Sequence, residues 1–473
     1  MSFQSFGFLA FLAATVLLCY MERSRKPLAV KLLLLASGIF CLLGTNGLSS
    51  LWVLLIGCAV TDTAVRRMRS DNGNPRLALI FACGFHLLVL AAFKYAAFLS
   101  GGTLGFGWVP IGISFFTFQQ LWLLKEVYTG EYVPAEEDNL VLYGFFFPTL
   151  TSGPILRPGR FFPQLRGEGF LNPGAQDAAA GLYAICCGTA KKVLLADPLG
   201  GVVNNGWGRL AELSAPAAWM VILGYTLQLY LDFSGYCDIA TGCARLLGIR
   251  LPVNFDSPYR AVSVDDFWKR WHITLTTFLR ECLYFPLGGS RRGTVRTYLN
   301  ILVIYLVSGI WHGAGWTFIF WGLLHGLAQV TERLLGKRLD CIPKAVRWVL
   351  TFAFVNVAWV FFRAPDLSGA FELLKTALTG GFAMPQSWLM QGVLSKEVGA
   401  LQLLFPALKG WASRIVVLVL FGTGLLVSFR RENTIRKMDA FRPTFWRAVV
   451  LCVLMTWSVL SFSGVATFIY SNF

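Results

Sequence analysis

Long apolar runs separated by short polar loops form the main pattern of this chain. Segments 32–42 and 415–429 carry no charge and are apolar on every face of a helix. A membrane-spanning strand would instead alternate apolar and polar residues. Because about 20 apolar residues span a bilayer as a helix, the pattern predicts an all-α polytopic membrane protein with roughly 11–13 transmembrane or re-entrant helices.

The composition agrees with this pattern. Of 473 residues, 56% are hydrophobic and 14% are charged, whereas soluble domains carry about 25% charged residues. A soluble globular enzyme and a disordered chain are therefore excluded. We expect one integral-membrane unit over residues 1–473, with N-terminal helices in 1–130, a motif-bearing core in 140–335 and C-terminal helices in 336–473.

The basic charge, +16 in total, fits cytoplasmic loops that collect Lys and Arg, so no nucleic-acid partner is expected. Basic clusters at 23–26 and 66–69 flank two apolar segments and are expected on the same, cytoplasmic side. Arg291 and Arg292 mark the same side later in the chain. The acidic stretch 131–138 falls where this count expects an inside loop, and it leaves the middle of the chain unplaced.

Residues 145–157 interrupt their apolar run with Pro148, Gly153 and Pro154. Non-helical backbone at membrane depth is tolerated only where protein or water surrounds it. We therefore expect re-entrant pieces lining a cavity there. The eleven cysteines show no CxxC spacing, so neither a metal site nor a disulfide framework is expected.

Three of the four histidines, His272, His312 and His325, cluster late in the chain, while His86 stands alone in an apolar helix and is expected to be a packing residue. A helix starting near Thr297 would rise ~22 Å by His312, within a core of ~30 Å. An ionisable residue there is a functional candidate, and imidazole suits general-base work. The alternative is a hydrogen bond to a neighbouring helix.

Gly309, Gly313 and Gly315 surround His312. Glycine permits close approach of a backbone or a ligand. His325 follows His312 by 13 residues, or roughly 220° around one continuous helix, so the two would not share a face. A structural role is expected for His325.

Ser263 and Asp266 have capping-box spacing and predict the start of a helix. This helix is too polar to span lipid, but it has an apolar stripe, which places it at the interface or dipping into the bundle. On it His272 shares a face with Trp268, and either lines a channel entrance or caps an interfacial contact. The stripe consists of Phe267, Trp271, Phe278 and Cys282.

Asp232 and Asp238 lie in a mostly apolar run. Such carboxylates are rarely left without a partner, and Arg245 or Arg250 is the expected one. Ion pairing is favoured over direct chemistry. The chain has no P-loop, GxGxxG, HExxH or GxSxG motif, so ATP-driven transport and metal-dependent hydrolysis are not supported.

Several motifs follow one another in order along the chain: SGPILR at 152–157, FPQL at 162–165, DFSGYCD at 232–238, NFDSPY at 254–259, FWKRWH at 267–272, LGGSR at 287–291 and WHG at 311–313. Together they resemble the membrane-bound O-acyltransferase (MBOAT) family, in particular its bacterial branch that holds the alginate O-acetyltransferase membrane subunit. Cys237 and Glu281 depart from that branch, which usually has Ser and Asp there. Neither departure involves His312, so they bear on which polymer is acetylated more than on the acyl-transfer chemistry.

The resemblance implies tilted helices around a transmembrane tunnel, with the acyl donor on the cytoplasmic side and the acceptor outside. It implies His312 and His272 as catalytic residues and no metal or permanently bound cofactor. Acetyl-CoA or another acyl thioester would be the donor substrate, and the bacterial inner membrane the location. Candidates for tunnel or substrate contacts are Asp232, Asp238, Asn254, Trp268, Trp311 and His325.

The function expected from residues and resemblance together is O-acetylation of an exported polysaccharide, alginate-like or cellulose, with His312 as general base. The expected partners are an extracytoplasmic SGNH-hydrolase-like acetyltransferase, the polysaccharide export machinery and membrane lipid. One alternative is a non-enzymatic carrier of acyl groups or polymer. The other is a member of the same family acting on peptidoglycan, teichoic acid or lipid.

Overall fold

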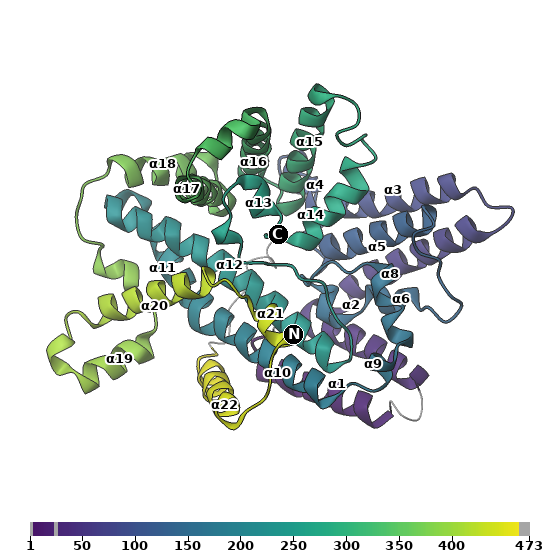
Figure 1. Cartoon of the computed structure of the whole chain (residues 1–473), viewed down its shortest axis with the longest axis horizontal. Coiled ribbons are helices and arrows are strands. Elements are labelled where there is room, and N and C mark those ends of the chain that lie inside the picture. The colour runs from purple at the N-terminus through teal and green to yellow at the C-terminus, as the bar shows by residue number, and fades with distance from the viewer. Residues whose placement is uncertain (1–2, 23–26, 463–473) are drawn as a thin grey trace.

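The computed structural model describes residues 3–22 and 27–462, and every regular element in these ranges is helical (Figure 1). The predicted all-α architecture is confirmed. The N-terminal helices are α1 (Phe6–Glu22), α2 (Pro27–Arg69), α3 (Pro75–Lys94), α4 (Ala96–Leu99) and α5 (Ile113–Tyr128).

Shorter and longer helices follow in the middle of the chain: α6 (Leu140–Gly144), α7 (Phe147–Leu150), α8 (Pro158–Phe161), α9 (Glu168–Leu171), α10 (Ala175–Ala190), α11 (Asp197–Trp207) and α12 (Ala215–Leu246). A π-helical segment, Lys191–Ala196, joins α10 to α11. Next come α13 (Val264–Trp268) and α14 (Ile273–Leu279), extended by the π-helical segment Arg280–Tyr284.

The remaining helices are α15 (Thr294–His312), α16 (Trp316–Leu335), α17 (Lys344–Arg363), α18 (Leu367–Thr379), α19 (Ser395–Leu404), α20 (Ala412–Ser428), α21 (Thr434–Asp439) and α22 (Phe445–Leu460). Among the described residues, five helical segments are long and apolar enough to cross a membrane. They are Leu48–Arg69, Pro75–Lys94, Ala175–Trp207, Thr294–His312 and Lys344–Arg363.

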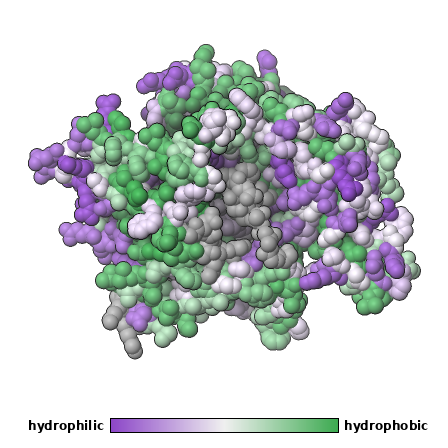
Figure 2. Space-filling model, turned by 180° about the vertical axis from the view of Figure 1, so that it is seen from behind, coloured by the Kyte–Doolittle hydropathy of each residue, from purple (hydrophilic) through white to green (hydrophobic). Residues whose placement is uncertain are grey.

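Large apolar side chains are exposed on the outer helices. Phe81 and Leu88 of α3 are each 71% exposed, and Leu418 of α20 is 69% exposed. Figure 2 shows hydrophobic residues over much of one face, with hydrophilic residues gathered mainly toward its two sides. Contiguous apolar surface of this kind marks an interaction surface, which for a polytopic protein is lipid.

The expectation that the basic clusters at 23–26 and 66–69 lie on the same side required a turn between two apolar segments, and the described residues contain no such turn. The two apolar segments expected between the first two basic clusters are parts of a single helix, α2, of 43 residues. Arg66, Arg67 and Arg69 lie in its last turn, so the helix does not bring its own two ends to one side. The cluster at 23–26 lies outside the described residues. Proline, which breaks helices most strongly, occurs in α2 only at the first residue, where it is tolerated.

Helix α12 crosses the centre of the molecule, beside α10 and α11 (Figure 1), and is buried along nearly its whole length. Small residues bring it close to α10. A Cβ on Gly188 would lie 2.5 Å from the Gly235 carbonyl oxygen, and one on Gly242 would lie 2.6 Å from the Gly181 oxygen. Such contacts between glycines are typical of helix packing in membranes.

The segment 145–157 is broken, as predicted. Only the single turn of α7 is helical there, and Phe145, Phe146, Phe147 and Leu156 are buried. Tyr143 donates a hydrogen bond from its hydroxyl to the carbonyl oxygen of Leu156, 2.5 Å away. The irregular backbone is therefore held inside protein, where its polar groups find partners.

The acidic stretch 131–138 is matched by basic side chains. Glu131 pairs with Lys125 at 2.5 Å, and the hydrogen bond from Lys125 lowers the pKa of the Glu131 carboxyl. Asp138 pairs with Arg166 at 2.9 Å, and Glu137 lies 3.7 Å from Lys31. Local pairing thus accounts for acidic residues at a position where the basic clusters predict an inside loop.

Candidate active site at the end of helix α15

A tight helical hairpin positions His312. Helix α15 ends at His312, and α16 begins at Trp316 after Gly313–Gly315. The two helices touch at glycines, since a Cβ on Gly309 would lie 2.4 Å from the Phe318 carbonyl oxygen. Helix α15 starts three residues earlier than predicted, so the rise to His312 along the helix is ~27 Å. This places His312 farther from the basic end of the helix than the sequence suggested.

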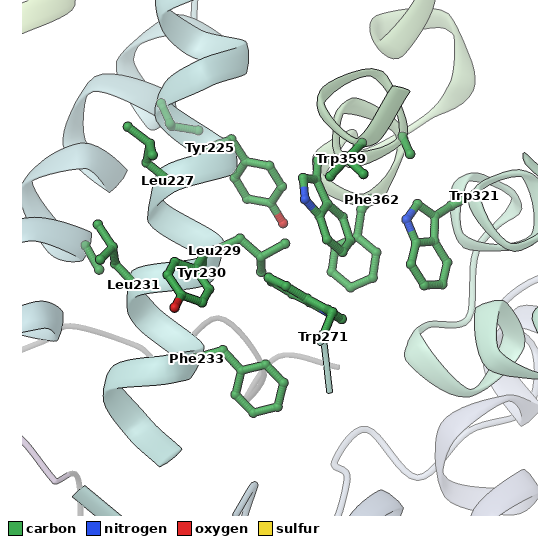
Figure 3. Packing of buried hydrophobic residues seen from close by; sticks show 14 of the residues in the cluster. Tyr225, Leu227, Leu229, Tyr230, Leu231, Phe233, Trp271, Trp321, Trp359 and Phe362 are labelled. Atoms are coloured by element: carbon green, nitrogen blue, oxygen red, sulfur yellow. The ribbon is translucent and has the colours of Figure 1, made fainter. Parts of the chain in front are cut away.

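Aromatic rings enclose His312, which is 2% exposed. Its ring centroid lies 4.8 Å from that of Trp311 and 5.1 Å from those of Trp321 and Phe362. Figure 3 shows Trp321 and Phe362 beside Trp359, with centroid separations of 5.1–5.8 Å among the three. The imidazole therefore lies in an apolar, water-poor environment.

His325 reaches the same aromatic cluster. Its ring lies 4.9 Å from Trp321, and its Nδ1 accepts a hydrogen bond from Trp268 Nε1 at 3.1 Å. The prediction that His312 and His325 do not share a face applied to one continuous helix, and the chain does not form one here. The chain turns at 313–315, so α16 runs back along α15 and both histidines contact Trp321.

The predicted helix around His272 is also interrupted. Ser263 caps α13 as expected, accepting from the Asp266 N–H at 2.9 Å, but α13 ends at Trp268 and α14 begins at Ile273. Two backbone hydrogen bonds tie this region to the segment before it: Asp256 N–H to the Arg270 oxygen, and Ile273 N–H to the Asn254 oxygen. Those bonds replace a continuous helix, so the predicted apolar stripe and shared faces do not form.

His272 is completely buried, not interfacial. It has a left-handed backbone conformation with φ of 45°. Its ring lies 4.9 Å from Phe233, 6.1 Å from Phe115 and 6.2 Å from Trp311. Trp311 is therefore a ring neighbour of both His272 and His312, as Trp321 is of both His312 and His325.

Asn254 fixes the orientation of His272. Its Oδ1 accepts from the backbone N–H of Thr274 at 3.2 Å and from its hydroxyl at 2.9 Å, and lies 3.2 Å from His272 Nδ1. Its Nδ2 donates to Cys237 Sγ at 3.3 Å. Because Oδ1 is an acceptor, Nδ1 of His272 carries a proton in this contact, which leaves the Nε2 lone pair as the basic site of a neutral ring.

Asp232 and Asp238 face lysines and not the predicted arginines. Lys192 Nζ lies 2.5 Å from Asp232 and Lys191 Nζ lies 2.7 Å from Asp238. Arg245 pairs with Asp177 instead, at 2.7 Å. Both lysines begin the π-helical segment after α10, which directs them at α12. The expected ion pairing is present, but with partners that lie 40–50 residues earlier in the chain.

Two further features concern residues outside the histidine cluster. His86 packs as expected, with Nε2 2.9 Å from the Thr61 hydroxyl. Lys94, which carries no prediction from the sequence, donates from Nζ to the carbonyl oxygens of Trp311 and His312. The sequence could have identified Lys94 as a candidate, because it is the single charged residue in the apolar run 77–99 and such residues usually have a partner or a function.

Comparisons with known proteins agree with the family resemblance that the sequence motifs indicated. Residues 139–364 match the model of the MBOAT, membrane-bound O-acyltransferase family. The chain is 36% identical over 414 residues to the peptidoglycan O-acetyltransferase of Helicobacter pylori, covering 78% of this chain and 77% of that protein. It is 37% identical over 351 residues to the probable alginate O-acetylase AlgI of Pseudomonas putida, covering 70% of each.

A more distant similarity is to the teichoic acid D-alanyltransferase of Bacillus subtilis, 26% identical over 271 residues, covering 53% of this chain and 68% of that protein. The first two relatives combine more than 30% identity with coverage above two thirds of their own length. Together with the family model, they show that the chain belongs to the MBOAT family and is a multi-pass O-acyltransferase of the bacterial inner membrane.

Proposed function

We propose that this protein moves an acetyl group from a cytoplasmic thioester, such as acetyl-CoA, to the outside for O-acetylation of an exported polysaccharide, with His312 as general base. Enzymes of this family use acyl thioester donors. The observation that carries the proposal is the position of His312 at the end of α15, enclosed by Trp311, Trp321 and Phe362.

The chemistry requires a base in a site that excludes water. His312 takes the proton of an acceptor hydroxyl, and the oxygen attacks the thioester carbonyl. The tetrahedral intermediate collapses with cleavage of the C–S bond, the acetyl group stays on the acceptor oxygen, and the imidazolium returns its proton to the departing thiolate. A dry environment suppresses hydrolysis of the donor, and fixed positions bring the reactants together.

Buried donors beside His312 support this assignment. The indole N–H groups of Trp311 and Trp321 have no hydrogen-bond partner among the described residues. Buried polar groups are normally satisfied, so oxygen atoms of a substrate are suitable partners for them. His272, held by Asn254 with its Nε2 lone pair available, serves in this proposal as the second catalytic histidine.

The positions of the basic helix ends support this direction of transfer. Helix α15 begins just after Arg291 and Arg292, and α3 begins after the basic end of α2. Basic loops favour the cytoplasm, so the histidine end of α15 faces outward. We propose a tunnel between these faces, with Trp268 and His325 in its wall and the donor entering from the basic side.

The proposal also concerns the identity of the acceptor polymer. The alginate relative and the family motifs support an alginate-like polysaccharide or cellulose as acceptor, delivered by export machinery and an extracytoplasmic SGNH-hydrolase-like partner. The peptidoglycan relative matches a longer part of this chain than the alginate relative does, 414 against 351 residues. This difference supports peptidoglycan as the second candidate acceptor. A non-enzymatic carrier loses support because the family is enzymatic.

The decisive experiment measures acetyl transfer from radiolabelled acetyl-CoA by the purified protein in lipid nanodiscs. His312→Ala is expected to lower the transfer rate by at least about 100-fold, since a general base contributes 10²–10⁴. His86→Gln is the matched control, because His86 is a buried histidine outside the cluster, and it is expected to retain transfer. Thermal unfolding of all three proteins confirms equal folding.

Equal rates in wild type and His312→Ala would contradict the general-base assignment.

The acceptor is tested separately in cells lacking the chromosomal gene. O-acetyl groups are quantified on isolated peptidoglycan and on secreted polysaccharide, with and without the wild-type gene restored. Acetyl groups that depend on the gene in only one fraction identify the polymer.

A further inference from the structure

Two adjacent residues at the end of α3 donate hydrogen bonds to the C-terminal end of α15, the helix that ends at His312. The last four carbonyl groups of an α-helix lack partners within the helix. In α15 these belong to Gly309, Ile310, Trp311 and His312. The Gly309 oxygen accepts from the Gly313 N–H at 3.3 Å, which leaves three carbonyl groups to be satisfied from outside the helix.

Lys94 and Tyr95 satisfy all three. The Tyr95 hydroxyl donates to the Ile310 oxygen at 2.7 Å. Lys94 Nζ donates to the Trp311 oxygen and, at 3.3 Å, to the His312 oxygen. The His312 end of α15 is thus held by side chains that lie more than 200 residues earlier in the sequence.

The surroundings of Lys94 show that this contact occupies the whole ammonium group. Its third donor reaches the Ser114 hydroxyl at 3.3 Å, and Nζ lies 5.7 Å from the centre of the Trp311 ring. Among the described residues no carboxylate forms an ion pair with Lys94. Its counter-charge is the helix itself, because the C-terminus of a helix carries about half a negative charge.

We propose that Lys94 and Tyr95 are positioning residues for the acyl transfer, which hold the last turn of α15 so that the His312 imidazole keeps the orientation needed for catalysis. This inference rests on the proposed function of His312. Without the two side chains the last turn is free to fray, because the three carbonyl groups lose their partners in an apolar environment. A displacement of the base by about 1 Å is enough to cost about 100-fold in rate.

The test separates positioning from donor binding. Lys94→Met keeps an unbranched, slightly shorter side chain but removes its donors, and Tyr95→Phe removes a single hydroxyl. We expect kcat to fall about 10–100-fold in Lys94→Met and less in Tyr95→Phe, with KM for acetyl-CoA within about twofold of wild type. Lys94→Arg, which retains donors and charge, is expected to recover most of the lost kcat.

Lys125→Met is the matched control, because Lys125 forms a salt bridge with Glu131 away from the histidine cluster, and it is expected to keep wild-type kcat. If either folded variant at 94 or 95 keeps wild-type kcat, or raises KM at unchanged kcat, the positioning role is wrong. If Lys94→Met does not fold, Tyr95→Phe alone decides.

His312→Ala is measured in the same series. If it transfers acetyl like wild type, the general-base assignment of His312 fails, and the positioning role fails with it. If His312→Ala is inactive while a folded Lys94→Met or Tyr95→Phe variant has wild-type kcat, only the positioning role is overturned.

Discussion

Two regions of the buried interior surround their ionisable side chains with different partners. Between α10 and α12, Lys191 and Lys192 form ion pairs with Asp238 and Asp232. Between α15 and α16, His312 and His325 are surrounded by aromatic rings. Buried charges require partners, whereas a neutral imidazole tolerates an apolar environment. The first region holds paired charges, whereas the second holds imidazole rings packed among aromatic side chains.

The largest expected effect comes from breaking one ion pair. Asp238→Leu leaves Lys191 buried without its carboxylate, and we expect the free energy of unfolding to fall by about 3–5 kcal/mol. The double variant Lys191→Met, Asp238→Leu removes both charges and is expected to recover most of that loss. Denaturant titration in mixed detergent micelles measures both values.

Acetyl transfer by the double variant tests whether this ion pair has a role in the reaction besides its structural one. If the pair is structural, the double variant transfers acetyl at a rate near that of wild type. A stable but inactive double variant would instead assign Asp238 a contact with substrate. A single variant as stable as wild type would contradict the pairing itself.

An intermediate effect is expected from widening the hairpin that holds His312. Gly309→Ala places a methyl group against the Phe318 carbonyl oxygen, and overpacking of this kind costs about 1–3 kcal/mol. The transfer rate should fall as well, because His312 is one turn away on the same helix. Gly422→Ala in α20 is the control, since its added Cβ meets no atom within 4 Å.

That control is expected to be neutral or to stabilise the protein by up to about 1 kcal/mol, because alanine favours a helix over glycine. Thermal unfolding and transfer rate are measured on both variants. A Gly309→Ala protein with wild-type stability and rate would show that the hairpin accommodates a wider spacing than its contacts indicate.

The smallest expected effect concerns the neutral hydrogen bond in the aromatic region. Trp268→Phe keeps a ring beside His325 but removes the donor to Nδ1, and we expect a loss of about 0.5–1.5 kcal/mol in stability. Trp446→Phe on α22, where the side chain is 74% exposed, is the control and should change stability by less than about 0.5 kcal/mol. A larger loss than in Asp238→Leu would reverse the ranking of the two regions.

Local signals in the sequence were sufficient for several features. The Ser263 cap depends on residues three positions apart, and the break at 145–157 follows from its prolines and glycine, so both were predicted correctly. The ordered motifs also led to the correct family. Each of these features is encoded within a short stretch of chain.

The features that were missed depend on distant contacts. The chain leaves the helical conformation before His272 because of hydrogen bonds to residues 254–256, and the partners of Asp232 and Asp238 come from another helix. Lys94 meets α15 only in the folded protein. Hydrophobic periodicity reports which side of a helix is apolar, but it does not report which helix lies opposite.

The left-handed backbone at His272 affects how this residue is studied. A φ of 45° is unfavourable for most side chains, but asparagine, aspartate and histidine tolerate it better than others. Replacing His272 by alanine therefore changes the local backbone preference together with the loss of the imidazole. Asparagine preserves the backbone preference, so the difference between the two replacements separates the conformational contribution of this residue from its chemical one.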